Sequence, residues 1–356
     1  MSSTPMQITL ELTPQARFDV INVTQHIREE IGDLLSRYSK TLYCSHHTTA
    51  GFLEQSLCAR LNYNRERLGS FLGVFQHLFP PDANYQHDKM HLRDELTEAQ
   101  KKVEPKNADS HLAFIGAGLK NCVTYRNDPE AAVHLIDLDG VWEHGVRTRR
   151  TTALGYNEER LVTQETYPIP VSKHHIDSVN LREDRVGLFG WLRELVQHHG
   201  ISKGRIEISL DPAEKHSGLT VNEYETLLMR HDLNEVLRNP VQFMADRGRN
   251  LLRDPKSIPN VTLNYARYDL VQVINQLIDL TGMSESIVER GVAKFMAAPA
   301  RRFLRIKRSV NLLVTDGDQG EAGDIVQGTY QSPVLVQWKK AETDSRHLQV
   351  RLHRFA

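Results

Sequence analysis

The sequence predicts an α+β protein made of two related modules, each with a mainly antiparallel β-sheet packed against helices. The chain has 356 residues, more than one hydrophobic core usually contains, so about two domains are expected. In each half, an amphipathic helical segment is followed by a strand and then by a polar loop. We therefore expect a duplication, with residues 1–160 as the first copy and residues 161–356 as the second.

The first half shows this order of elements. Residues 7–12 alternate apolar and polar side chains, which is typical of a half-buried strand. Thr24 is a candidate N-cap for a helix with one apolar face, and residues 40–44 predict the strand that follows it. The apolar face comprises Ile27, Ile31, Leu34 and Leu35.

The second half repeats the order. Residues 186–199 predict an amphipathic helix that ends at Gly200, and residues 205–210 predict the next strand. Between the halves, residues 155–178 contain two prolines and lack helical periodicity, so they favour an extended tether. The apolar stripe of the helix comprises Leu188, Trp191, Leu192 and Leu195.

Composition excludes several classes of function. Lysine and arginine total 44 residues and aspartate and glutamate 45, a net charge of −1, whereas proteins that bind nucleic acid or anionic membranes normally have a basic surplus. Three cysteines are too few for a disulfide framework. The sequence has no signal-like N-terminal segment and no apolar run of about 18 residues. We expect a cytoplasmic protein that binds a small molecule, with no nucleic acid and no membrane as partner.

Three histidines lie in recognisable local motifs of the first half. They are His47 in Ser-His-His-Thr-Thr-Ala, His87 in Tyr-Gln-His and His111 in Asn-Ala-Asp-Ser-His-Leu. A catalytic divalent ion binds about three imidazole or carboxylate donors and keeps one position for water. The histidines therefore predict a metal site, with Zn²⁺ preferred and Fe²⁺ or Mn²⁺ as alternatives. His46 is the runner-up, as a partner that orients a ligating ring.

These motifs resemble those of the YjbQ-like family of small proteins, known as secondary thiamine-phosphate synthases. The resemblance covers roughly residues 7–155, with gaps. It implies a phosphate-ester-forming enzyme and an oligomer, commonly a trimer, so we expect a homo-oligomer. The matching residues are His47, Thr49, Ala50, Tyr85, His87, Asn107, Ala108, His111 and Leu112.

The second half carries family motifs that the first half lacks. Residues 217–225 resemble the family's strand and keep its Asn-Glu as Asn222-Glu223, where the first copy has Gln55-Ser56. Conversely, Glu214 aligns with His47. We infer that one copy kept the metal ligands and the other kept their polar partners, so that the active site is shared between copies.

Several polar residues are candidates for catalysis. Asp109 can orient His111 or act as a base toward metal-bound water, although a turn or helix-cap role fits it equally well. From the second copy, Glu223 is the candidate for proton transfer. Gln331 ends Gly328–Gln331, which resembles the family's Gly-Thr-Trp-Gln, and is a candidate for substrate binding.

Basic and amide side chains are candidates for substrate binding. Arg147 and Arg149 share one face of a predicted strand and can hold a carboxylate or phosphate by paired hydrogen bonds, with a solvated edge strand as the alternative. Asn107 completes this set. Two charge-dense insertions, residues 88–106 and 242–259, are interpreted as solvated surface segments, with functional lids as the alternative.

Three functions fit these observations. The first is a metal-dependent enzyme that acts on a small anionic metabolite and is related to the YjbQ-like synthases. The second is a metal-dependent hydrolase or lyase with another metabolite as substrate. The third is a non-catalytic binding or scaffold protein. No glycine-rich phosphate loop or dinucleotide fingerprint indicates a nucleotide cofactor.

Overall fold

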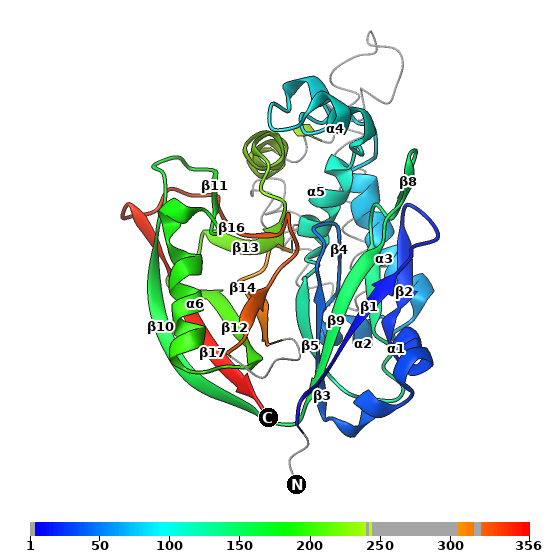
Figure 1. The fold of residues 1–356 in the computed structure, drawn as a ribbon. Helices are drawn as coiled ribbons and strands as arrows, with labels where there is room; N and C mark the ends of the chain where they lie inside the picture. The colour runs from blue at the N-terminus through cyan, green and yellow to red at the C-terminus, as the bar shows by residue number, and fades with distance from the viewer. Residues whose placement is uncertain (1–3, 240–241, 244–304, 317–321) are drawn as a thin grey trace, which may run out of the picture.

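The protein was analysed as a computed structural model, which describes residues 4–239, 242–243, 305–316 and 322–356. Antiparallel sheets with helices packed against them form both halves (Figure 1). Every strand pairing among the described residues is antiparallel. The predicted α+β class is therefore confirmed.

The first half alternates short strands with helices. Its strands are β1 (Met6–Leu12), β2 (Asp19–Asn22), β3 (Lys40–Ser45), β4 (Ala50–Gly51), β5 (Cys122–Arg126), β6 (His134–Asp137), β7 (Val141–Trp142), β8 (Gly145–Val146) and β9 (Arg149–Tyr156). Its helices are α1 (Val23–Ile31), η1 (Leu34–Arg37), α2 (Gln55–Arg60), α3 (Arg65–Leu78), η2 (Met90–Leu92), α4 (Glu98–Val103) and α5 (Ala108–Ala117).

The second half follows after only two residues. Its strands are β10 (Glu159–Pro170), β11 (Asp177–Asn180), β12 (Lys203–Leu210), β13 (Ser217–Asn222), β14 (Ser309–Thr315), β15 (Asp324–Val326), β16 (Ser332–Gln337) and β17 (Ser345–Phe355). Its helices are η3 (Asp184–Val186), α6 (Leu188–His198), the π-helix η4 (Leu227–Asp232) and α7 (Leu233–Arg238).

The two halves have matching strand orders. The large sheet of the first half has the order β1-β9-β3-β5, and that of the second has β10-β17-β12-β14 with β15 added at its edge. A smaller sheet has the order β2-β6-β4 in the first half and β11-β16-β13 in the second. In each half, therefore, the first strand pairs with the last, and the last pairs with the strand that precedes the polar loop.

Hydrogen bonds at the loops repeat as well. His47 Nε2 accepts a hydrogen bond from the Arg150 backbone N–H at 2.7 Å, at the start of β9. In the second half, Glu214 Oε1 accepts one from the His347 backbone N–H at 3.0 Å, at the start of β17. His47 and Glu214, which the sequence alignment pairs with each other, therefore make the same kind of hydrogen bond to the last strand of their own half.

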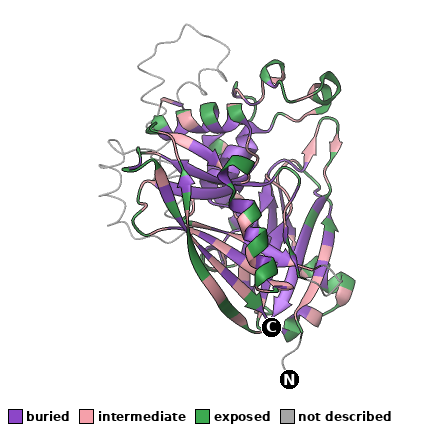
Figure 2. Cartoon of the chain, turned by 60° about the vertical axis from the view of Figure 1, so that its left-hand side comes forward, coloured by how far each residue is buried: buried purple, intermediate pink, exposed green. Residues whose placement is uncertain are grey.

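The halves share parts of one core. Buried residues of α7 and β16 belong to the same hydrophobic cluster as those of α3 and α5. The two large sheets meet through β3 and β5 on one side and β14 on the other. Figure 2 shows buried residues running through the centre of the molecule, whereas exposed residues lie mainly on outer helices and loops.

Separate expression of residues 1–160 and 165–356 is expected to give poorly soluble fragments. Each fragment would expose apolar residues that the other half buries in the full chain. The measurement is the soluble fraction of each fragment and its elution in size-exclusion chromatography, with the full chain as control. Two well-folded monomeric halves would contradict the prediction, and this experiment also tests the division at residue 160.

Helix α5 is buried along its whole length. Every residue from Ala108 to Ala117 is buried, and the helix packs between α3 and β13. Gly118 ends it in the left-handed region, with φ +70°. A helix buried on all sides is normally apolar all round, yet α5 carries Asp109, Ser110 and His111 near its first turn. These polar side chains must be satisfied inside the protein or serve a ligand.

The first predicted helix begins and ends earlier than expected. Asn22, not Thr24, is the N-cap, since its side chain accepts a hydrogen bond from Gln25 N. Thr24 lies inside the helix and accepts from Val133 N at 2.9 Å. The helix ends before Gly32, whose φ is +65°. Leu34 and Leu35 therefore fall in η1 and not on the face of α1.

The predicted tether between the halves was wrong. Residues 155–156 still belong to β9, and residues 159–170 form β10, which pairs with β17 along its length. β10 is the edge strand of its sheet, where proline is tolerated because no ladder hydrogen bond is lost on the free side. Pro168 and Pro170 thus occur in an edge strand and not in a linker. By contrast, the helix predicted at residues 186–199 is present as α6.

The first insertion is more than a solvated surface. Residues 88–106 contain η2 and α4, but Arg93 within them has a side chain only 2% exposed. The second insertion, residues 242–259, lies outside the described residues apart from its first two. None of the described helices is long and apolar enough to span a membrane.

Candidate functional site

A cavity of about 410 Å³ lies between the two halves and contains most of the candidate residues. The first half of the chain lines it with the loop after β3, the insertion at residues 88–106, the loops after β6 and β8, Asn107 before α5 and Arg149 at the start of β9. Glu223, Thr329 and Tyr330 come from the second half. The site therefore contains residues of both copies within one chain.

His111 does not line this cavity, but it presents a bare ring nitrogen to Glu223, which does. Its Nδ1 lies 2.7 Å from Asn222 Oδ1. Asn222 Nδ2 donates to Thr48 O at 3.1 Å, and Glu223 N donates to Asn222 Oδ1 at 2.9 Å, so Oδ1 is an acceptor. His111 Nδ1 must therefore carry the hydrogen. Its Nε2 is buried and has no hydrogen-bond partner among the described residues.

The electrostatics keep His111 neutral. Complete burial, followed by the charge of His87, lowers the pKa of His111 to about 3. The Nε2 lone pair is thus available at neutral pH. An atom of this kind can accept a hydrogen bond from a hydroxyl or water, or bind a metal ion.

Glu223 faces His111 from the other half. It follows β13, and its Oε2 lies 3.7 Å from His111 Nε2. Arg93 Nη2 donates to Glu223 Oε1 at 3.4 Å. Burial raises the pKa of Glu223 although His87 and Arg93 oppose the shift. The carboxyl group therefore holds a proton more readily than an exposed glutamate does.

His87 is held on both sides of its ring. Its Nδ1 lies 2.9 Å from Glu225 Oε2, and its Nε2 lies 3.3 Å from Asn107 Oδ1. Asn107 Nδ2 donates to Asp139 Oδ2 at 2.7 Å, which fixes Oδ1 toward the ring. Burial is the largest influence and lowers the pKa of His87, but the hydrogen bond to Glu225 and the charges of Glu223 and Glu225 together outweigh it, so the pKa is raised. We infer a cationic ring that donates from both nitrogens.

His47 lines the cavity, but its ring nitrogen is engaged. Because Nε2 accepts from the Arg150 backbone N–H, binding an ion through this atom would require that bond to break. Burial, followed by the charge of Arg149, lowers the pKa of His47 to about 3. His46 also lines the cavity because β3 ends at Ser45, and its Nε2 lies 3.0 Å from Thr152 Oγ1.

Gln331 holds the histidine loop from the second half. Its Nε2 donates to Ser45 O at 2.9 Å and to His47 O at 2.7 Å. A side chain at Gly328 would collide with the His46 carbonyl, so glycine is required where this segment meets the loop. Gln331 itself does not line the cavity. Its place favours a positioning role over the substrate contact that the sequence predicted.

Arg147 and Arg149 both line the cavity, but the predicted shared strand face was wrong, because Arg147 lies in the loop between β8 and β9 and only Arg149 belongs to β9. Arg149 is committed to two buried carboxylates: its Nε and Nη2 each donate to Asp137 at 2.6 Å, and Nη2 also donates to Asp139. Burial raises the pKa of Asp139, but Arg149 and then Arg147 outweigh it and hold the pKa well below its usual range. Arg147 Nη2 lies 3.2 Å from Asp139 Oδ2.

Asp109 is not brought into the cavity. It pairs with Arg17, whose Nη2 lies 2.8 Å from Oδ1. Burial raises the pKa of Asp109 to about 7 despite Arg17. Because Asp109 precedes His111 by two residues on a helix, the two side chains point in different directions. No group of three His, Cys, Asp or Glu side chains suited to a metal ion occurs in the part of the chain that the structure describes.

Two residues of the site have no individual prediction from the sequence. Glu225 pairs with His87, and Arg93 pairs with Glu223. Glu225 could have been found as the next acidic residue in the segment that contains Asn222-Glu223. Arg93 has no such signal, because one arginine in a charge-dense segment looks like a surface residue.

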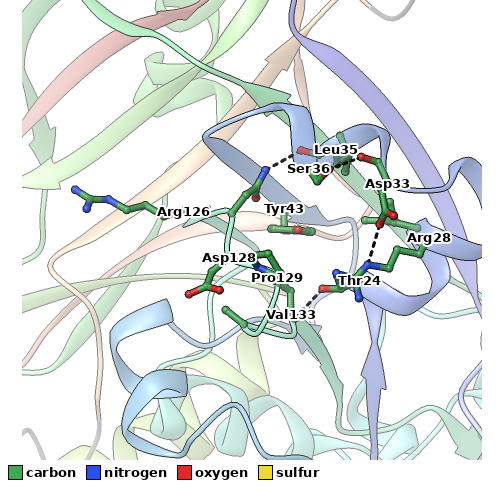
Figure 3. A pocket seen from close by; sticks show the side chains of 13 residues that line it. Thr24, Arg28, Asp33, Leu35, Ser36, Tyr43, Arg126, Asp128, Pro129 and Val133 are labelled. Atoms are coloured by element: carbon green, nitrogen blue, oxygen red, sulfur yellow. Dashed lines mark hydrogen bonds and ion pairs between the residues drawn. The ribbon is translucent and has the colours of Figure 1, made fainter.

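A second cavity, of about 350 Å³, lies between α1, η1 and the loop after β5 (Figure 3). Tyr43 lies at its floor, and burial raises the pKa of this phenol to about 12. The polar groups around it pair with one another: Asn127 Nδ2 donates to Leu35 O at 2.9 Å, and Arg28 lies 3.3 Å from Asp33. We therefore place the candidate site in the first cavity, where buried polar atoms lack partners.

Comparison with known proteins gives solved structures only. No protein-family model and no curated protein matches the chain. A YbjQ-like protein of unknown function from Sulfolobus solfataricus P2 is 13% identical with a TM-score of 0.29, and the match covers 55% of this chain and 99% of that one. An uncharacterized yjbq/upf0047-family protein from Clostridium acetobutylicum is 12% identical, with a TM-score of 0.24 and coverages of 53% and 98%. The family that the motifs resemble thus also occurs among the structural neighbours.

Proposed function

We propose that the protein is an enzyme that acts on a small anionic metabolite in the cavity between its two halves. The main support is the bare, buried Nε2 of His111 opposite Glu223. A buried polar atom without a partner costs about 1–3 kcal/mol. Such an atom therefore calls for a partner, which a water, a ligand or a reacting group can supply.

The pair can move a proton. A water oxygen about 2.8 Å from each atom would bridge His111 Nε2 and Glu223 Oε2, which are 3.7 Å apart. The water would donate one hydrogen to His111 Nε2 and would thereby be oriented. Glu223 in its ionised form would then take the other hydrogen as a proton and leave a hydroxide held by His111. Asn222 fixes the tautomer of His111, so it acts as a positioning residue.

The predicted three-histidine metal centre does not fit this arrangement. The ring nitrogen of His47 that carries the lone pair accepts a hydrogen bond from a backbone N–H, and both ring nitrogens of His87 face hydrogen-bond acceptors. Of the three rings, His111 alone offers a bare nitrogen, and Glu223 is its neighbour. A catalytic zinc site needs about three protein ligands. The proposed reaction step therefore uses no metal ion, and binding of Zn²⁺, Fe²⁺ or Mn²⁺ remains a prediction.

Elemental analysis of protein purified without a metal-affinity tag tests that prediction. If an ion is bound, we expect about one per chain, and His111→Ala should remove it because this residue has the free nitrogen. His47→Ala serves as the comparison, since its ring is engaged elsewhere. Absence of any stoichiometric ion in the unmodified protein would contradict metal binding.

Product analysis tests the proposed function. The full chain is incubated with phosphorylated and carboxylated small metabolites, and product formation separates a transferase from a hydrolase or lyase. Loss of the product in Glu223→Gln would support the proposal. Absence of turnover across the panel would favour a non-catalytic binding protein.

A further inference from the structure

Two guanidinium groups in the candidate cavity have donors without acceptors. Arg93 and Arg147 both line it. Arg93 Nη1 and Arg147 Nε are buried atoms without a hydrogen-bond partner among the described residues. The Arg93 side chain is only 2% exposed. Both atoms are N–H donors that cannot act as acceptors, so they require an acceptor from a ligand or from solvent.

The remaining contacts hold Arg93 in place. Its Nε donates to Glu95 Oε1 at 2.6 Å, and its Nη2 donates to Glu223 Oε1 at 3.4 Å. Glu104 Oε1 lies 3.9 Å from Nη1, which is beyond hydrogen-bond distance. The long bond to Glu223 is therefore the weaker of the two hydrogen bonds to Arg93.

Arg147 is also held in place, and one of its N–H donors lacks a partner. Its Nη2 pairs with Asp139 at 3.2 Å, and its guanidinium lies 5.1 Å from the centre of the Trp142 ring. These contacts set the plane of the group and leave Nε without a partner. Arg149, the third arginine of the lining, donates to Asp137 and Asp139 and is already paired.

We propose that an oxyanion group of the substrate, a phosphate or carboxylate, binds between Arg93 and Arg147. This inference rests on the proposed function of the same cavity. Phosphate and carboxylate oxygens match guanidinium donors in geometry and charge. The two arginines thus set the substrate class.

Calorimetric titration of inorganic phosphate into the full chain tests the subsite. We expect Arg93→Met and Arg147→Met each to weaken phosphate binding by about 10-fold to 100-fold. Arg160→Met is the matched control, because this arginine is 72% exposed on β10 and should leave binding unchanged. Arg93→Lys keeps the charge but not the paired donors, so this variant should bind phosphate more weakly than the unmodified protein does. Its thermal unfolding checks that it is folded.

Unchanged phosphate affinity in both Arg93→Met and Arg147→Met, or saturation absent in the unmodified protein, would overturn the subsite.

The two proposals fail separately. If Glu223→Gln abolishes turnover while Arg93→Met and Arg147→Met both bind phosphate normally, the subsite is wrong and the proposed enzyme stands. If phosphate binding depends on Arg93 and Arg147 but no turnover is found, the subsite stands and the enzymatic proposal fails.

Discussion

Glu223→Gln is expected to lower turnover by about 100-fold or more, the lower range for a positioned proton-transfer group. Glutamine keeps the shape and hydrogen-bonding capacity of the side chain but cannot take a proton. Glu223 lies 3.7 Å from His111 Nε2. The substitution removes the proton acceptor but leaves a side chain of the same shape in the cavity. The measurement is kcat with the metabolite identified by product analysis, together with thermal unfolding to confirm the fold.

Glu143→Gln is the matched control, because Glu143 is exposed and does not line the cavity. Its turnover should equal that of the unmodified protein. A Glu223→Gln enzyme with unimpaired turnover would rule out the proposed role. Mixing inactive His111→Ala with inactive Glu223→Gln should restore nothing, since the two side chains lie 3.7 Å apart within the same chain. Recovery would instead show that the site is shared between chains.

Local periodicity predicted most of the elements that position the site. The strand before the histidine loop and helix α6 were found because alternation and helical spacing are properties of short segments. The tether failed for a physical reason, since β10 is held by its pairing with β17, almost 200 residues later. Prolines at a sheet edge give the same local signal as prolines in a linker.

The alignment of the two copies was the most informative signal for the site. It indicated that Glu223 of the second copy compensates for what the first copy lacks, and Glu223 lies opposite His111 in the structure. It could not show that the His47 ring accepts a hydrogen bond from Arg150 N, because this bond forms only when β9 lies beside the loop. Burial of Arg93 likewise arises from tertiary packing and not from a local pattern.

The two copies have diverged at the position of His47, which in the second half holds a side chain with a structural role. Glu214 replaces the histidine there, and it accepts hydrogen bonds from Arg346 Nη1 at 2.5 Å and from His347 N at 3.0 Å. Arg346 in turn donates to Gln337 Oε1 at 3.0 Å. These bonds give Glu214 a structural role in holding the start of β17. Glu214 therefore keeps the contact with the last strand that His47 makes in the first half.

Arg149→Met is expected to lower the free energy of unfolding by about 3–5 kcal/mol, the cost of removing one partner from a buried ion pair. Arg149 is 2% exposed at its side chain and is the counter-ion of Asp137 and Asp139. Methionine fills much of the volume but leaves two buried carboxylates without their main cation. Urea unfolding at pH 7 measures the loss.

Arg150→Met is the matched control from the next position of β9, because Arg150 is exposed and its loss should change stability by less than about 0.5 kcal/mol. Adding Asp137→Asn to Arg149→Met should restore part of the stability, since it removes one uncompensated charge. A single variant as stable as the control, or a double variant no better than the single one, would show that the carboxylates do not depend on Arg149.

The pH dependence gives an independent check of the cause. Arg149 and Arg147 depress the pKa of Asp139 in the folded state, so this group contributes stability above its unfolded pKa of about 3.9 and loses it as pH falls through the folded value. Arg149→Met removes most of this contribution. The difference in unfolding free energy between the unmodified protein and the variant should therefore be largest near neutral pH and shrink on acidification below about pH 4. A difference that stays constant with pH would assign the loss to packing and not to charge.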